Sequence, residues 1–275
     1  MSKRVCFIGG GNMAEAMIAG MVGEYCDAKN IIVVDRNKNK RDFLVRKYGV
    51  NVVDSAADTV KSTDILVLAI KPQQMKELIL DIKDNIKSKQ LIITVAAGLE
   101  IEFYEKLFSK KISVARVMPN IPSSLGYGAA GVFFNKDVND NQKKTVVDVI
   151  RTMGVVEVVK QENDINLVTA CSGSGPAYYL LFMEHMINSA VSRGFTKKQA
   201  ESLVVQTCLG AAQMAMNSSS DISTLRENVT SKKGVTAEAL RVFEESDLGG
   251  IIDKAIEANI IRSEELANEM SSNLD

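Results

Sequence analysis

FIGGGNMAEAM, residues 7–17, is the stretch of this 275-residue sequence that decides the fold. The apolar, partly β-branched run that leads into it, Val5–Ile8, predicts a buried strand. From Met13 onward, the apolar residues recur with the spacing of one face of a helix. Three consecutive glycines therefore lie between a strand and a helix, where the chain must turn sharply.

Within that turn, Gly9, Gly11 and Ala14 have the order G-x-G-x-x-A of a dinucleotide-binding motif. Gly9 permits the tight turn, Gly11 lets the backbone approach a pyrophosphate, and Ala14 lets the helix pack close to the strand. The N–H groups at the start of the helix then face the phosphates. A glycine-rich turn without a ligand is the alternative, but the order of strand, turn and helix favours nucleotide binding.

The composition argues against several classes of function. Lys and Arg number 33 against 34 Asp and Glu, so the chain lacks the basic surface of a nucleic-acid binder. One histidine, and four cysteines without a C-x-x-C pair, offer no ligands for a zinc site, so we expect no metal. No apolar stretch is long enough to span a bilayer, and the first is too short for a secretory signal. We expect a cytoplasmic protein with free thiols and neither a nucleic-acid nor a membrane partner.

The first half of the chain alternates strand-like and helix-like segments. Predicted strands are residues 5–8, 31–34, 50–53, 65–70, 91–95, 114–118, 131–134 and 155–159. Apolar strands without alternation, separated by helical patterns, indicate a mostly parallel, doubly wound sheet with helices on both faces. We therefore expect an α/β Rossmann domain over residues 1–162.

After Glu162 the strand patterns end, which predicts an all-α domain over residues 163–275. Expected helices are residues 164–171, 175–193, 197–216, 220–229, 236–245 and 248–270. The segment AYYLLFMEHMIN, residues 177–188, is apolar nearly all round, and such a helix is stable when it is buried on several sides. A symmetric homodimer through this domain would bury it.

The carboxyl ends of the predicted strands carry candidates for cofactor binding, because open α/β sheets bind ligands there. The second strand ends at Asp35, which would accept from the ribose 2′-OH of NAD. In the basic run that follows, Arg36 or Lys38 would instead pair with the 2′-phosphate of NADP, although a solvated helix start has the same pattern. Both cofactors stay possible, with NADP(H) slightly favoured over NAD(H). Lys71-Pro72 and VAAG, residues 95–98, end two further strands, and the small residues leave room for a flat ring.

Two later stretches suggest more than a structural role. MPNIP, residues 118–122, places two prolines after a strand and fixes a stiff loop over the same sheet edge. SGSGPAY, residues 172–178, joins two predicted helices, with Pro176 suited to a first helical turn. Small residues at such a connection let a substrate approach the backbone, although a plain helix connection has the same pattern.

The chain contains IGGGNMAEAMIAG, LAIKPQ, VARVMPNIPSSLGYG, CSGSGPAYYLLFMEHM, GAAQMA and LRENVTSKKGVT. Together these stretches resemble the successive motifs of the pyrroline-5-carboxylate reductase family, which catalyses the last step of proline biosynthesis. The similarity extends from the first strand to about Glu265. It implies NAD(P)H-dependent reduction of the cyclic imine 1-pyrroline-5-carboxylate to L-proline. It also implies a homodimer whose helical domain completes the active site against its partner, and in many members a decamer.

The motifs and the resemblance together predict two groups of site residues. The expected cofactor-binding residues are Gly9, Gly10, Gly11, Asn12, Met13, Asp35, Arg36, Ala69, Lys71, Pro72, Ala96, Ala97, Gly98 and Pro119. The expected substrate-binding residues are Met118, Asn120, Ser174, Ser231, Gly234, Val235 and Thr236. By resemblance, backbone N–H groups of residues 229–236 hold the ring carboxylate, and the Thr236 hydroxyl hydrogen-bonds or protonates the imine nitrogen.

The same loop departs from the family pattern. Members usually read S-P-G-G-T-T where this chain has Ser231, Lys232, Lys233, Gly234, Val235 and Thr236. Gly234 and Thr236 keep their places, so the cradle survives if Lys233 adopts the positive φ that the family assigns to glycine. Two solvated lysines on the loop are the expected arrangement, and the alternative is that Lys232 and Lys233 add cationic attraction for the carboxylate.

Three other functions compete with this interpretation. A β-hydroxyacid dehydrogenase-like enzyme would carry a carbonyl-polarising lysine on the helix after the domain boundary, and residues 175–192 contain no lysine. That favours a substrate with its own positive charge, such as a protonated imine, and a broader imine reductase also fits. A non-catalytic NAD(P)-sensing module, with the altered loop as its only support, would bind NADPH without turnover.

Overall fold

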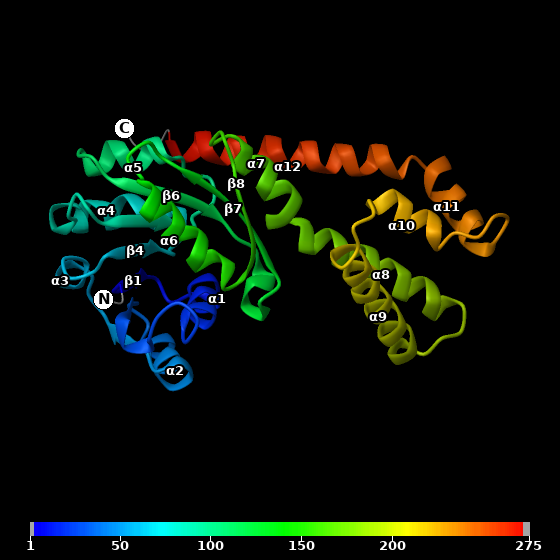
Figure 1. Ribbon diagram of the computed structural model, residues 1–275, viewed down its shortest axis with the longest axis horizontal. Helices are drawn as coiled ribbons and strands as arrows, with labels where there is room; N and C mark the ends of the chain where they lie inside the picture. The colour runs from blue at the N-terminus through cyan, green and yellow to red at the C-terminus, as the bar shows by residue number, and fades with distance from the viewer. Residues whose placement is uncertain (1–2, 272–275) are drawn as a thin grey trace. The chain divides into compact units, whose positions relative to one another are not determined.

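The computed structural model describes residues 3–271, which group into two compact units (Figure 1). The first unit contains residues 3–174 together with 258–271, and the second contains Gly175–Glu257. Each unit is described by itself below.

An eight-stranded sheet with the order β3-β2-β1-β4-β5-β6-β7-β8 forms the centre of the first unit. The strands are β1 (Val5–Ile8), β2 (Ile31–Val34), β3 (Asn51–Val53), β4 (Ile65–Leu68), β5 (Leu91–Thr94), β6 (Ser113–Met118), β7 (Gly128–Phe134) and β8 (Gly154–Val158). All neighbours are parallel except β6 and β7, which are antiparallel. The eight predicted strands and the mostly parallel, doubly wound sheet are confirmed, with strand ends that differ by at most three residues.

Helices cover both faces of this sheet, as the uninterrupted apolar strands predict (Figure 1). One face packs against α1 (Asn12–Met21), α2 (Lys38–Tyr48) and α6 (Asp140–Arg151). The other packs against α3 (Ala57–Val60), α4 (Met75–Ile82) and α5 (Ile101–Phe108). Alternate residues of one strand serve the two cores, since Phe7 of β1 joins the first and Cys6 joins the second.

The order of the strands fixes where a ligand can bind. Register pairs β1 with β2 on one side and with β4 on the other, so the chain reverses its direction of travel across the sheet at β1. A crevice forms outside the carboxyl ends of the strands at such a switch point, because the loops from the two strands leave in opposite directions. The glycine turn after β1 lies at this point.

Residues after Glu162 begin helical, as expected, but the first of them belong to the first unit. Here α7 (Asp164–Val168) continues into one π-helical segment, η5 (Thr169–Gly173), in which the Ser174 N–H donates to the Thr169 carbonyl at 2.8 Å. A Cβ added to Gly131 of β7 would lie 2.5 Å from Val168, so α7 packs directly on the sheet. The contacts therefore divide the chain after Ser174, whereas the domain boundary expected after Glu162 stays a prediction.

The second unit contains α8 (Gly175–Ser192), α9 (Lys197–Met216), α10 (Ile222–Asn228), α11 (Val235–Glu245) and the first part of α12 (Leu248–Ser271). The expected helices are confirmed, and a capping box between Thr196 and Gln199 starts α9 at the predicted residue. Large apolar side chains of these helices are exposed in the single chain, and Tyr179 of α8 keeps 68% of its surface. The others on α8, α9 and α12 include Leu180, Leu181, Phe182, Met186, Leu203, Val205, Leu209, Met214, Ile251 and Ile252. The apolar faces expected to pack against a partner are thus uncovered within one chain.

The cysteines divide by environment. All four thiols are free: Cys6 and Cys26 are buried, Cys208 is half-buried and Cys171 is exposed. Burial raises the pKa of the Cys6 thiol to about 12, which keeps it neutral in the core. Among residues 3–271, no helix has the length and apolar character needed to cross a bilayer. No cluster of His, Cys, Asp or Glu in this part of the chain could hold a metal ion.

Candidate active site

The glycine turn brings the end of β1 against the end of β4. Gly9 has φ +100°, a conformation that a side chain makes costly, and its N–H donates to the Val34 carbonyl at 2.8 Å. A Cβ added there would lie 2.4 Å from the carbonyl oxygen of Ala69. Only glycine fits this position, because the backbone directly after β4 packs against the turn without room for a side chain.

Gly11 has the opposite surroundings. It is the N-cap residue of α1, and a Cβ added to it would meet no atom within 4 Å. Asn12 and Met13 form the first turn of α1, whose N–H groups have no partner within the helix. Ala14 is fully buried against the sheet. The turn therefore presents helix N–H groups to open space, as a pyrophosphate site requires.

Asp35 at the end of β2 holds the glycine turn from the side. Its Oδ2 accepts from the Gly10 N–H at 2.8 Å, and its Oδ1 accepts from the Asn37 N–H at 2.7 Å. The Asp35 side chain keeps only 13% of its surface. Both carboxylate oxygens therefore have backbone donors, and the carboxylate is directed toward the chain itself.

The basic residues that follow are differently placed. Arg36 is 89% exposed in its side chain, and its nearest carboxylate, that of Glu77, lies 4.0 Å away. Lys38 instead pairs with Asp42 at 2.7 Å. Arg41 donates to the carbonyl oxygens of Asp35 and Arg36 and so fixes the backbone under the Arg36 side chain. Arg36 is therefore the cation with the most freedom to meet a phosphate at this end of the sheet.

Residues on the other side of β1 continue the same edge. Ala69 donates its N–H to the Ile8 carbonyl at 2.9 Å, and Lys71 precedes the short helix η2 (Pro72–Gln74). After β5, Ala96 is buried and Ala97 is exposed, and Gly98 turns the chain with φ +75°. The predicted cofactor residues thus lie along one edge of the sheet, as expected, and their contact with a cofactor stays a prediction.

Asn120 and Ser174, expected to bind substrate, both have protein partners. The Asn120 amide accepts from the Ala129 N–H at 3.0 Å and donates to the Ser172 carbonyl at 3.0 Å. The Ser174 hydroxyl accepts from Asn259 of α12 at 2.9 Å. Met118 and Pro119 complete the loop, and Met118 packs against Gly173. Asn120 and Met118 therefore hold the end of β6 and the loop after it against η5, whereas Ser174 is joined to α12. A direct substrate contact of these residues stays a prediction.

The altered loop of the second unit keeps the shape that the family pattern requires. Lys233 has φ +61°, so the lysine adopts the left-handed conformation that the sequence comparison demanded. Gly234 donates its N–H to the Ser231 carbonyl at 3.0 Å and caps α11, which makes Val235 and Thr236 its first two residues. A Cβ on Gly234 would lie 2.0 Å from Ser231 Oγ. The backbone N–H groups of this first turn can therefore face an anion.

Lys233→Gly should stabilise the protein by about 1 kcal/mol, because the left-handed conformation strains a residue with a Cβ. Urea unfolding followed by circular dichroism measures the change. Lys232→Gly is the matched control, since φ is not positive at Lys232 and glycine there only adds disorder to the unfolded chain. Equal effects of the two substitutions would contradict the strain at Lys233.

Some residues of the site were missed by sequence reasoning. Arg116 and Glu162 form an ion pair at 2.9 Å, with the Arg116 side chain only 5% exposed. Arg116 interrupts the apolar strand SVARVM, and a charge inside a buried strand is a signal that a partner must exist. Asn259, the partner of Ser174, comes from a helix far along the chain and has no local signal.

Two family models match separate parts of the chain. The family model "pyrroline-5-carboxylate reductase dimerisation" matches residues 162–266, and "NADP oxidoreductase coenzyme F420-dependent" matches residues 4–98. The pyrroline-5-carboxylate reductase of Vibrio alginolyticus is 39% identical over 96% of this chain and 97% of its own length. That of Pseudomonas aeruginosa is 35% identical over 98% of each chain.

Solved structures are similar over the same length. A pyrroline-5-carboxylate reductase from Coxiella burnetii superposes with a TM-score of 0.93 at 37% identity, covering 97% of this chain and 99% of its own. A pyrroline carboxylate reductase from Plasmodium falciparum, crystallised with NADP bound, has a TM-score of 0.85 at 29% identity, covering 96% and 98%.

Proposed function

Because the chain belongs to the pyrroline-5-carboxylate reductase family, we propose that it reduces 1-pyrroline-5-carboxylate to L-proline with NAD(P)H. The conformation of the loop before α11 is the observation that best supports this substrate. Gly234 and Thr236 keep the family positions, and Lys233 adopts positive φ in place of glycine. The positive φ of Lys233 supports the proposal that this loop can still hold the ring carboxylate despite its departure in sequence.

The reaction adds a hydride to the C=N carbon and a proton to the nitrogen. The nicotinamide cofactor supplies the hydride when bound, so the protein must orient the substrate and stabilise its charges. The first turn of α11 offers backbone N–H groups and the positive end of its dipole to the ring carboxylate. The Thr236 hydroxyl donates its proton to the imine nitrogen as the C=N bond is reduced, and solvent then returns a proton to the hydroxyl. No side chain has to serve as a covalent nucleophile.

The cofactor is proposed to lie across the carboxyl ends of β1 and β4. Its pyrophosphate meets Gly11 and the first turn of α1, and its adenosine ribose meets Asp35 and Arg36. The residues expected along the remaining edge are Gly9, Gly10, Ala69, Lys71, Pro72, Ala96, Ala97, Gly98 and Pro119. NADPH is the favoured cofactor, because Asp35 already accepts two backbone N–H groups while Arg36 is exposed.

Arg36→Ala should lower kcat/KM for NADPH about 10-fold, because the loss of one charge-assisted hydrogen bond to a phosphate weakens binding by about that factor. The value for NADH should stay within about twofold of the wild type, because NADH has no 2′-phosphate to lose a partner. Steady-state rates with both cofactors measure the two ratios. Lys38→Ala is the matched control, since Lys38 is already paired with Asp42. Equal losses for both cofactors would contradict recognition of the 2′-phosphate by Arg36.

The matched dimerisation model makes the chain part of a homo-oligomer, and we propose a homodimer through the helical domain. A decamer built from such dimers is the larger assembly implied by the family. The exposed apolar side chains of α8 and α9 support the dimer, because each large one removed from water contributes about 1.5–3 kcal/mol. The dimer is also proposed to complete the active site.

Sedimentation velocity should show a dimer or a larger species at micromolar concentration. Leu181→Glu, on the exposed surface of α8, should shift the distribution toward smaller species, because a charge would be buried without a partner. A wild-type protein that sediments as a clean monomer would contradict the proposed dimer.

The proposed reaction is tested by oxidation of NADPH and, separately, of NADH, with and without 1-pyrroline-5-carboxylate. Substrate-dependent loss of nicotinamide absorbance, with L-proline as the product, supports the proposal. Cofactor binding without turnover would instead indicate that the Lys232–Lys233 loop has changed the substrate, and other cyclic imines would be tried next. A reaction that draws on the NAD(P)H pool is proposed to take place in the cytoplasm.

A further inference from the structure

The loop between β5 and α5, residues 95–100, lies in the half of the sheet that faces away from the adenosine end. The adenosine ribose is proposed to bind beside Asp35, at the end of β2, and β5 lies on the other side of β1. A dinucleotide that crosses the switch point therefore extends its nicotinamide toward β4 and β5. Whatever holds this loop also holds one wall of the space for the nicotinamide ring.

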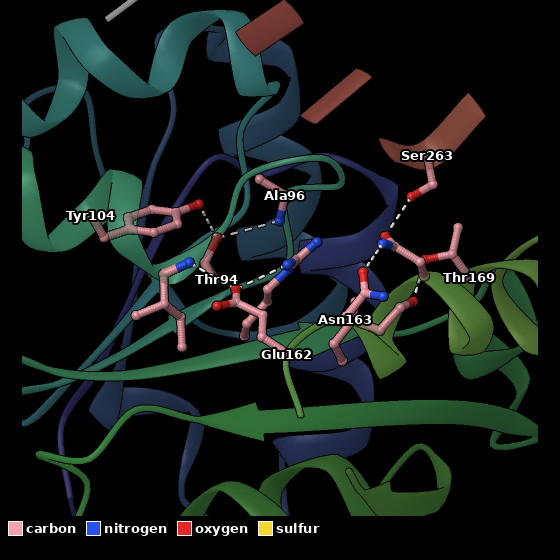
Figure 2. Close-up of polar contacts among 11 residues, drawn as sticks. Thr94, Ala96, Tyr104, Glu162, Asn163, Thr169 and Ser263 are labelled. Atoms are coloured by element: carbon pink, nitrogen blue, oxygen red, sulfur yellow. Dashed lines mark hydrogen bonds and ion pairs between the residues drawn. The ribbon is translucent and has the colours of Figure 1, made fainter. Parts of the chain in front are cut away.

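The start of the loop is fixed by a buried hydrogen bond. Thr94 Oγ1 and the Tyr104 hydroxyl lie 2.5 Å apart, and Thr94 Oγ1 also accepts from the Ala96 N–H at 3.4 Å (Figure 2). Tyr104 is fully buried on α5, and burial raises its pKa, so the phenol stays protonated. The last residue of β5 is thereby joined to the helix that follows the loop.

The end of the loop is fixed by Glu162. Its Oε1 accepts from the Ile101 N–H at 2.8 Å and from Arg116 at 2.9 Å (Figure 2). Ile101 is the first residue of α5, and the N-cap residue Glu100 makes no side-chain cap hydrogen bond. Glu162 therefore caps α5 from a distant part of the chain and places its charge at the positive end of the helix dipole.

The middle of the loop rests on α12. A Cβ on Gly98 would lie 3.7 Å from Leu266 Cβ, which is ordinary contact distance. The same part of α12 is tied to α7, because the Ser263 hydroxyl donates to Asn166 Oδ1 at 2.8 Å (Figure 2). The loop thus has a support at each end and one along its length, and the support at the start of α5 is an ion pair, Glu162 with Arg116.

We propose that Glu162, with Arg116 behind it, is a positioning residue for the nicotinamide half of the cofactor. It acts through the Ile101 N–H on the loop Ala96–Gly98 and does not itself touch the reacting atoms. Loss of the carboxylate leaves the buried Arg116 without its partner and α5 without its cap, so the loop shifts. This inference rests on the proposed function, since it assigns the loop to the nicotinamide ring of NAD(P)H.

The test compares two ligands that differ only in that ring. Calorimetry measures the Kd of NADPH and of 2′-phospho-ADP-ribose, which has the adenosine and pyrophosphate but no nicotinamide. Glu162→Ala should weaken NADPH about 10-fold and leave 2′-phospho-ADP-ribose within about twofold. The kcat should also fall about 10-fold, because a small misplacement of the ring slows hydride transfer. Glu162→Gln, whose amide oxygen still accepts from Ile101, should restore part of both losses.

Val149→Ala is the control for a purely structural effect. Val149 is fully buried in α6 on the opposite face of the sheet, so its truncation lowers the Tm without touching the loop. It should leave the affinities of both ligands unchanged. If Glu162→Ala does not fold, the same two Kd values are compared in Glu162→Gln and Arg116→Lys.

Equal losses of affinity for the two ligands, or no loss for NADPH, would overturn the positioning role. Failure of the wild-type protein to oxidise NADPH with 1-pyrroline-5-carboxylate would instead overturn the proposed reaction. The two failures are distinguishable, because the binding comparison does not depend on turnover.

Discussion

Gly11→Val should abolish measurable cofactor binding while the protein still folds. A Cβ added to Gly11 would meet no atom of the chain within 4 Å, so the fold should tolerate the substitution. The same space is where we propose that the pyrophosphate approaches the first turn of α1. A clash of about 3 kcal/mol there weakens the Kd by at least about 100-fold. Titration of NADPH by fluorescence or calorimetry measures the loss.

Gly9→Val provides the contrast. Its Cβ would lie 2.4 Å from the Ala69 carbonyl, and φ is +100°, so this substitution should lower the Tm or prevent folding. Gly11→Val should keep a Tm within a few degrees of the wild type. A Gly11→Val protein that binds NADPH as tightly as the wild type would mean that the glycine turn is not the pyrophosphate site.

Thr236→Ala should lower kcat by about 100-fold, the usual effect of removing a positioned proton or hydrogen-bond donor. Thr236 is the second residue of α11, and its hydroxyl is the side-chain donor that the family pattern places at the imine nitrogen. The KM for 1-pyrroline-5-carboxylate should change less, because we propose that backbone N–H groups hold the ring carboxylate. Steady-state kinetics at saturating NADPH separate the two constants.

Two substitutions control for this result. Thr236→Ser keeps the hydroxyl and should retain most of the activity. Val242→Ala truncates another apolar residue of α11, one that is 53% exposed and lies outside the proposed substrate site, and should change kcat little. A Thr236→Ala enzyme with a normal kcat would remove this hydroxyl from the mechanism and leave proton delivery to water.

Local sequence determined most of the secondary structure. The glycine turn after β1, the eight apolar strands and the helices after Glu162 were all predicted, and α9 begins and ends at the expected residues. These features depend on periodicity, capping and glycine conformation, which act between neighbours in the sequence. The left-handed conformation of Lys233 was a condition for the proposed cradle and was not predicted from local sequence, because a side chain disfavours positive φ.

The direction of β7 was not specified by its own residues. An apolar strand buried on both faces has the same pattern in parallel and antiparallel sheets. The connection from β6 to β7, residues 119–127, is too short for a parallel crossover, which needs a dozen residues or more. Because the sequence predicted that this strand starts at Gly131, the connection was expected to be long enough for a parallel crossover.

Only the tertiary structure decided how the polar groups of the site are used. The sequence offered Asp35 to a ribose and Asn120 to a substrate, and both contacts stay predictions. It did not indicate that Asp35 accepts from Gly10 or that Asn120 joins Ala129 to Ser172. In the same way, Glu162 caps a helix that begins at Ile101, and Ser263 of α12 reaches Asn166. Sequence patterns specify which groups must be buried, but the partner of each buried group depends on which distant segments pack together. That pairing is set by the fold, because a buried polar group is stable only with the donor or acceptor that packing brings to it.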